Sequence, residues 1–138
     1  TATVAHLTNR FTQIGSEATI TKQDKLPLAP EWTGYLESVF VIPLAAGDLS
    51  LGASGYVTSE QYHLIPNSDL ERENGYVLID ARASFAPNGA DWTVSMYATN
   101  LFDEVYRTFG QDSTASFGVA AGWYGRPREY GVDLRWRW

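Results

Sequence analysis

The residues of this chain that could carry out catalysis or bind a metal are few and widely spaced. There are two histidines, His6 and His63, and no cysteine, which excludes thiol chemistry, disulfides and thiolate-bound zinc. His63 lies beside Tyr62 in a polar segment, where it could touch a ligand or metal, although a solvated loop histidine is the simpler interpretation. No Gly-x-Ser-x-Gly or phosphate-loop pattern occurs. We therefore expect no enzymatic activity, no cofactor and no metal.

The carboxylates also have a simpler explanation than catalysis. Asp80 and Asp133 could in principle act as acid and base. Each alternates with arginine, as in Asp80 and Arg82, so ion pairs between neighbouring strands explain them better, with Arg82, Arg135 or Arg137 as the partner. The net charge of -6 provides no basic excess for a nucleic-acid partner.

Two polar segments carry residue types that often contact ligands. One is the Glu-Arg-Glu stretch around Arg72, and the other spans residues 103–125. Within the second, the possible ligand-contacting residues are Tyr106, Arg107, Trp123 and Tyr124. The alternative is that these aromatic residues form an interfacial girdle or pack the loop on itself.

The elements that must position these residues are β-strands, because apolar and polar residues alternate with a period of two. In the last segment Tyr130, Val132, Leu134, Trp136 and Trp138 fall on one face, and only glycine or charged residues fall on the other. The same pattern, weakest in the first segment, predicts six strands near residues 1–12, 31–44, 48–59, 74–85, 91–102 and 128–138. The fold class is therefore all-β, an antiparallel up-and-down meander.

The connections between these strands alternate strictly between long and short. Residues 13–30, 60–73 and 103–127 form long polar links, whereas tight turns are predicted around Gly47 and at Asn88-Gly89. Trp92 follows the second turn, which should place it level with Trp136. Short turns would thus lie at one end of the sheet and long loops at the other, as in outer-membrane barrels.

A soluble alternative and a membrane reading remain at this point. A soluble or surface β-sheet could serve as a binding module for a small ligand or carbohydrate, and its strands would alternate as well. It would have to bury Trp136 and Trp138 at a chain end that usually frays, which favours the membrane reading. No run of roughly 20 apolar residues is present, so a spanning helix is excluded. An enzyme barrel is disfavoured, since no Ser, His and acid set can be assembled by spacing.

Three motifs resemble a known family. The stretches "LPLAPEWTGYLE", "NLFDEVYRTFG" and "YGRPREYGVDLRWRW" resemble the C-terminal barrel of TonB-dependent outer-membrane receptors, over about residues 26–138. Asn100, Leu101, Phe102, Asp103 and Tyr106 match the second motif, and Tyr124, Gly125, Pro127, Arg128 and Tyr130 match the third. One departure is Trp138, because phenylalanine is commoner at the end of this family's last strand.

The resemblance implies a role in the outer membrane of a Gram-negative bacterium. Such receptors import scarce solutes such as iron–siderophore complexes, and their barrels have about 22 strands around a plugged lumen. Residues 1–138 would be a C-terminal barrel fragment without the plug domain. The implied partners are outer-membrane lipid, the barrel-assembly machinery, the remaining barrel and plug, a TonB-type energy transducer acting through that plug, and the solute ligand. Tyr130, Val132, Leu134, Trp136 and Trp138 would face lipid and form the assembly signal.

Overall fold

The protein is described by a computed structural model that covers residues 1–138. Its main element is one antiparallel sheet with the strand order β1-β2-β3-β6-β7-β10. The six strands are β1 (Ala2–His6), β2 (Trp32–Leu44), β3 (Gly47–Thr58), β6 (Tyr76–Pro87), β7 (Trp92–Thr99) and β10 (Glu129–Trp136). All six predicted strands and the up-and-down order are confirmed. The first is shorter than predicted, since it ends at His6 and not near residue 12.

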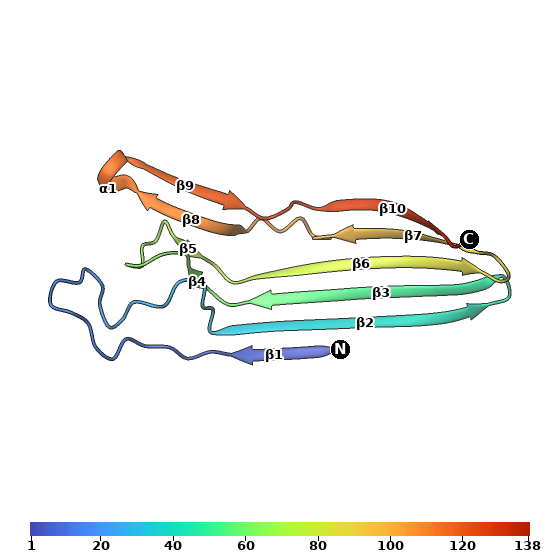
Figure 1. Cartoon of the computed structure of the whole chain (residues 1–138), viewed down its shortest axis with the longest axis horizontal. Helices are drawn as coiled ribbons and strands as arrows, with labels where there is room; N and C mark the ends of the chain where they lie inside the picture. Colours follow the sequence, from blue (N-terminus) through green and yellow to red (C-terminus); the bar gives the residue numbers. More distant parts are fainter.

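The two ends of the sheet differ as the alternation of link lengths predicts. Both short turns lie at one end, and the long links gather at the other (Figure 1). Gly47 at the first turn has φ 149° and Gly89 at the second has φ 68°, backbone conformations that suit glycine. The Asn88 side chain also donates a hydrogen bond to the Ala45 carbonyl at 3.1 Å, which ties the two turns together.

Two small sheets at the loop end were not predicted. Strands β4 (Gln61–Tyr62) and β5 (Arg72–Glu73) pair with each other, and so do β8 (Arg107–Ser113) and β9 (Val119–Tyr124), which are joined by a short helix, α1 (Thr114–Phe117). Sequence analysis assigned both regions to loops. The error has a physical cause, because β9 is exposed along its whole length and its residues "VAAGWY" therefore show no alternation.

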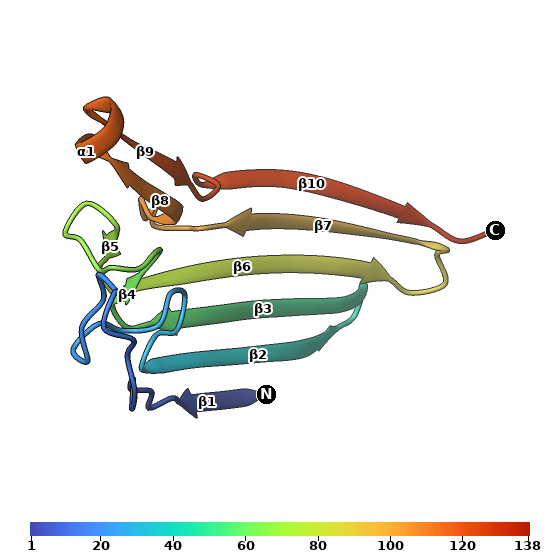
Figure 2. The same ribbon diagram turned by 60° about the vertical axis from the view of Figure 1, so that its left-hand side comes forward.

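The main sheet is a single layer without an apolar core. Figures 1 and 2 show the strands side by side, and neither view shows a second layer packed on the sheet. Only 8 of the 138 residues are buried, and none of these is hydrophobic. Large apolar side chains on the strands are instead exposed, so nothing within the chain covers them.

The only helix, α1, is four residues long, and no helix is both long and apolar enough to cross a membrane.

Candidate functional site

The register sorts the strand residues of the main sheet onto two faces. Partners across antiparallel strands share a face, so the rows can be followed from β2 to β10. One such row runs Phe40, Leu51, Ala83, Met96 and Val132. We call this side the apolar face; besides that row it carries Trp32, Leu36, Ile42, Leu49, Val57, Val77, Ile79, Phe85, Trp92, Val94, Tyr130, Leu134 and Trp136. No strand residue on it is an Asp, Glu, Lys or Arg.

The predicted aromatic C-terminal strand lies at one edge of the apolar face. Tyr130, Val132 and Leu134 are 80%, 63% and 68% exposed. Trp136 pairs with Trp92, which confirms that the two tryptophans stand at one level beside the short turns. Trp138 follows β10 and is fully exposed. The register therefore places the strand residues of this set together, while the solvent that they meet stays a prediction.

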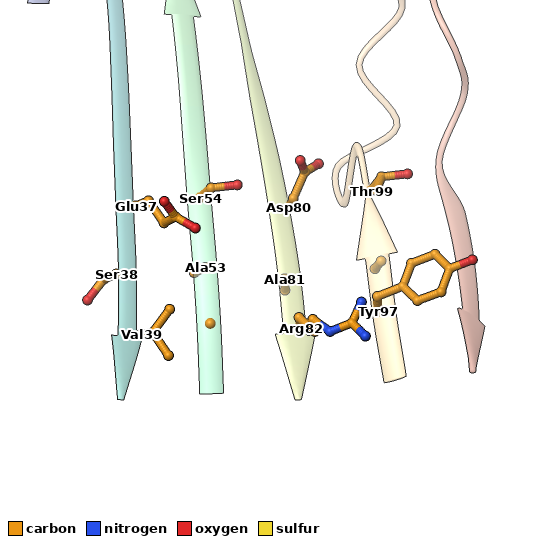
Figure 3. Close-up of a pocket in the computed structure, with 12 residues that line it drawn as sticks. Glu37, Ser38, Val39, Ala53, Ser54, Asp80, Ala81, Arg82, Tyr97 and Thr99 are labelled. Carbon is orange, nitrogen blue, oxygen red and sulfur yellow. The ribbon is translucent and has the colours of Figure 1, made fainter. Parts of the chain in front are cut away.

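The opposite side, which we call the polar face, holds an open pocket of about 280 Å³. Figure 3 shows Glu37 on β2 and Asp80 and Arg82 on β6 in this pocket, with β3 between the two strands. Arg82 forms an ion pair with Asp133 at 2.8 Å, as predicted for cross-strand charges, and its guanidinium also lies 5.9 Å from the centre of the Tyr97 ring. Asp80 has a different partner from the one expected, since it accepts a hydrogen bond from the Asn100 backbone at 2.9 Å.

Asn100 ends β7 and fixes the path of the chain between β7 and β10. Its φ of 48° is left-handed, a conformation that asparagine tolerates. The side chain is buried and fully bonded: Nδ2 donates to the carbonyls of Glu104 (2.9 Å) and Arg126 (3.1 Å), and Oδ1 accepts from the Glu104 backbone (2.8 Å). The Asn-Leu-Phe-Asp motif is thus a structural junction.

At the end of the sheet where the long links gather, the 60–75 loop is bonded to the 103–128 loop. The first loop carries β4 and β5, and the second carries β8, α1 and β9. Arg107 makes the central contacts: its Nε pairs with Glu73 at 2.8 Å, and its other nitrogens donate to the carbonyls of Leu70 and Arg72. The Glu71 carboxylate accepts from the Asp112 backbone at 2.8 Å. Both glutamates of the Glu-Arg-Glu stretch are buried, whereas Arg72 between them is exposed, and contact of this stretch with a ligand stays a prediction.

The four residues predicted to contact a ligand do not converge on one pocket. Tyr106 stacks on Tyr76 at 4.6 Å, and Arg107 is held by its partners in the 60–75 loop. Trp123 packs against Phe109 at 5.5 Å and is half-exposed, and Tyr124 is exposed. Trp123 and Tyr124 are therefore the members of the set that remain accessible, and contact with a ligand stays a prediction for all four.

His63 differs most from its expected state. Sequence analysis favours a solvated loop histidine, yet its side chain is 1% exposed and neither ring nitrogen has a hydrogen-bond partner. The residues that bury it, Phe109 and Gly110, are far away in the sequence, so no local pattern could have revealed this. Glu71, Glu73 and Asp112 were missed for the same reason.

No group of three or more His, Cys, Asp or Glu side chains lies close enough to hold a metal ion. Some charged groups of the polar face and of the two loops pair with each other, as Arg82 does with Asp133 and Arg107 with Glu73.

Comparison with solved structures identifies the fold. The chain matches the crystal structure of the ferric yersiniabactin uptake receptor FyuA from Yersinia pestis with a TM-score of 0.76 and 21% sequence identity. The match covers 88% of this chain but 18% of the receptor, so the chain spans less than a fifth of that protein's length. No protein-family model matches the sequence, and no curated protein matches it significantly. The six-stranded all-β fold is therefore that of a segment of the receptor's barrel.

Proposed function

We propose that residues 1–138 form the C-terminal part of the barrel of a TonB-dependent receptor, in the outer membrane of a Gram-negative bacterium. The observation that supports this most strongly is the apolar face, which extends over the strands of a single-layer sheet without one Asp, Glu, Lys or Arg residue. Membrane barrels need such a face outside and a polar one inside. The structural likeness to an uptake receptor agrees with this reading.

The two outer strands of the sheet support a larger assembly. β1 pairs with β2 only from Trp32 to Leu36, so beyond Glu37 the β2 backbone has a strand, β3, on one side only, and β10 has one neighbour, β7. Unpaired backbone groups cost several kcal/mol each in a hydrocarbon environment. The proposal therefore includes further strands of the same receptor on both sides, with a plug domain inside the closed barrel.

In this proposal the apolar face meets lipid and the polar face lines the lumen. Tyr130, Val132, Leu134, Trp136 and Trp138 contact lipid and form the strand that the barrel-assembly machinery recognises. The 60–75 and 103–128 loops lie outside the cell, where Tyr106, Arg107, Trp123 and Tyr124 belong to the region that meets the solute. That solute is a scarce compound such as an iron–siderophore complex, and a TonB-type energy transducer acts through the plug.

Tryptophan fluorescence in lipid vesicles tests the membrane placement. Two variants of the complete receptor would keep a single tryptophan, either Trp136 on the apolar face or Trp123 in β9, with every other tryptophan replaced by phenylalanine. We expect lipids brominated in their acyl chains to quench Trp136 strongly and Trp123 little. Acrylamide in the water should give the reverse order. Equal quenching of the two residues by brominated lipid would refute the lipid-facing assignment.

The solubility of the isolated chain separates this proposal from the soluble binding module. We expect residues 1–138 to require detergent micelles to stay dispersed, because the apolar face has no cover of its own. A monomer that folds cooperatively in plain buffer would overturn the membrane assignment. Uptake of ferric siderophores by cells that depend on the complete receptor would then test the class of solute.

A further inference from the structure

His63 is the most unusual side chain outside the two sheet faces. It is the one large side chain in the structure that is completely buried, and its Nδ1 and Nε2 are the only buried side-chain nitrogen or oxygen atoms without a hydrogen-bond partner. A buried polar group without a partner normally destabilises a structure. Such a group therefore calls for a role that its chemistry can explain.

The imidazole lies at the contact between the two loops. On one side the 60–75 loop holds its backbone, since the His63 N–H donates to the Glu71 carbonyl at 3.0 Å. On the other side β8 closes over the ring: Phe109 lies 6.0 Å away between ring centres, and a Cβ at Gly110 would stand 3.0 Å from Nδ1. A larger residue at position 110 would therefore require the imidazole or β8 to shift slightly.

The charges around the ring favour its neutral form. Burial lowers the pKa of His63, and the Arg107 guanidinium lowers that pKa further. The Glu73 carboxylate and the backbone of Arg107 and Glu71 raise it, but the net shift is downward. Glu73 is already paired with Arg107 at 2.8 Å, and the nearby carboxylates of Glu71 and Asp112 accept backbone hydrogen bonds from the 103–128 loop. Glu73, the carboxylate that favours the charged imidazole, is thus shared with the Arg107 guanidinium.

We propose that His63 is a pH-sensitive latch, whose neutral ring allows the 60–75 loop to dock on the 103–128 loop and whose protonation separates them. An imidazolium ion would need hydration or well-placed hydrogen-bond acceptors, and in the docked arrangement the ring is buried and neither of its nitrogens has a hydrogen-bond partner. Separation of the loops gives the ring access to water. The inference rests on the loop contacts alone, and it does not depend on the proposed transport function.

The direction of the pH dependence follows from proton linkage. The docked state binds fewer protons than the separated state, in which His63 has its ordinary pKa of about 6.5. Docking is therefore favoured at neutral pH and weakens as the pH falls below that value, at most about tenfold per pH unit.

Distance measurements between spin labels test the latch. The chain has no cysteine, so Asp69→Cys and Ser116→Cys place one label on each loop at exposed positions. In the complete protein we expect one narrow distance distribution at pH 7.5, which broadens between pH 6.5 and 5. The added change His63→Phe keeps a ring of similar size but cannot be protonated, so it should hold the narrow distribution throughout. His6→Phe, on the apolar face, should leave the pH response intact.

Two results would overturn the proposal. One is a distribution that stays narrow down to pH 5 with His63 in place, and the other is a broadening that persists in His63→Phe. If the distance distribution of His63→Phe is already broad at pH 7.5, NMR of the His63 imidazole in the His6→Phe protein provides the test. We expect His63 to take up its proton together with the change in label distance. Protonation at pH 6.5 without any change in distance would contradict the latch.

Discussion

The six-stranded main sheet, called the wall below, and the two loops at its end, residues 60–75 and 103–128, are stabilised in opposite ways. In the wall, backbone pairing along six strands fixes the structure, and large side chains such as Phe40 and Met96 remain exposed. In the loops, pairing is short, and buried polar groups such as Glu71 and Glu73 make the contacts. The wall thus depends on the solvent around it to accept its apolar face, whereas the loops carry their own interior.

This difference predicts which changes the wall does not tolerate. Val132→Arg places a charge on the apolar face, and in a lipid bilayer it should cost about 2–4 kcal/mol near the midplane. Ser50→Arg lies on the polar face of β3 and should cost far less. The free energy of unfolding of the complete protein in lipid vesicles measures both. Similar losses for the two variants would remove the distinction between the faces.

A change in the loops should act locally. Arg107→Ala leaves Glu73 buried without its ion-pair partner and frees the carbonyls of Leu70 and Arg72, which should cost about 2–3 kcal/mol of loop docking. Hydrogen exchange should rise across the 60–75 and 103–128 loops and stay unchanged in β3 and β6.

Arg126→Ala is the matched control for that experiment. The Arg126 side chain is 84% exposed and reaches Glu129 at 3.5 Å, so its loss should change stability by less than about 1 kcal/mol. Faster exchange throughout the main sheet of Arg107→Ala would show that the wall and the loops are one cooperative unit.

Asn100 lies where the wall meets the 103–128 loop, so its replacement tests how strongly the two regions depend on each other. Asn100→Ala loses three side-chain hydrogen bonds and places alanine at a left-handed φ of 48°, for an expected cost of about 1–2 kcal/mol. Thermal unfolding measures the total effect. Asn100→Asp keeps the acceptor for the Glu104 backbone but turns a carboxylate oxygen toward the carbonyls of Glu104 and Arg126, so it should recover little of the loss. An aspartate variant as stable as the original protein would contradict the role of the two donated bonds.

The smallest expected effect is a pH response at one end of α1. Hydrogen bonds from the Thr114 hydroxyl and backbone hold the pKa of Asp112 below its usual value. Its stabilising effect is therefore complete above the usual pKa of about 3.9 and is lost as the pH falls through the lower folded value. The rate of proteolysis near α1, measured between pH 5 and 3, should depend less on pH in Asp112→Asn. Glu17→Gln, in the first long link, should leave that pH dependence unchanged.

The wall could be predicted from the sequence, and the loops largely could not. Alternation in segments such as 128–138 reveals a strand because each of its faces has one environment, and Asn88-Gly89 marks its turn by local chemistry. The partners of His63 and Arg107 are set by contacts between residues more than 30 positions apart. The aromatic residues from Tyr106 to Tyr124 therefore indicated an important region, but not which of them would be buried.

The single-layer sheet also shapes how its sequence can vary. Adjacent residues of one strand, such as Ser50 and Leu51, sit on opposite faces, so acceptance of charged substitutions should rise and fall at every second position. A saturation mutagenesis profile of β2, β3, β6, β7 and β10 would then show a strong correlation at a spacing of two residues. In β9, which is exposed on both sides, that oscillation should vanish, so the profile alone would mark where the wall ends.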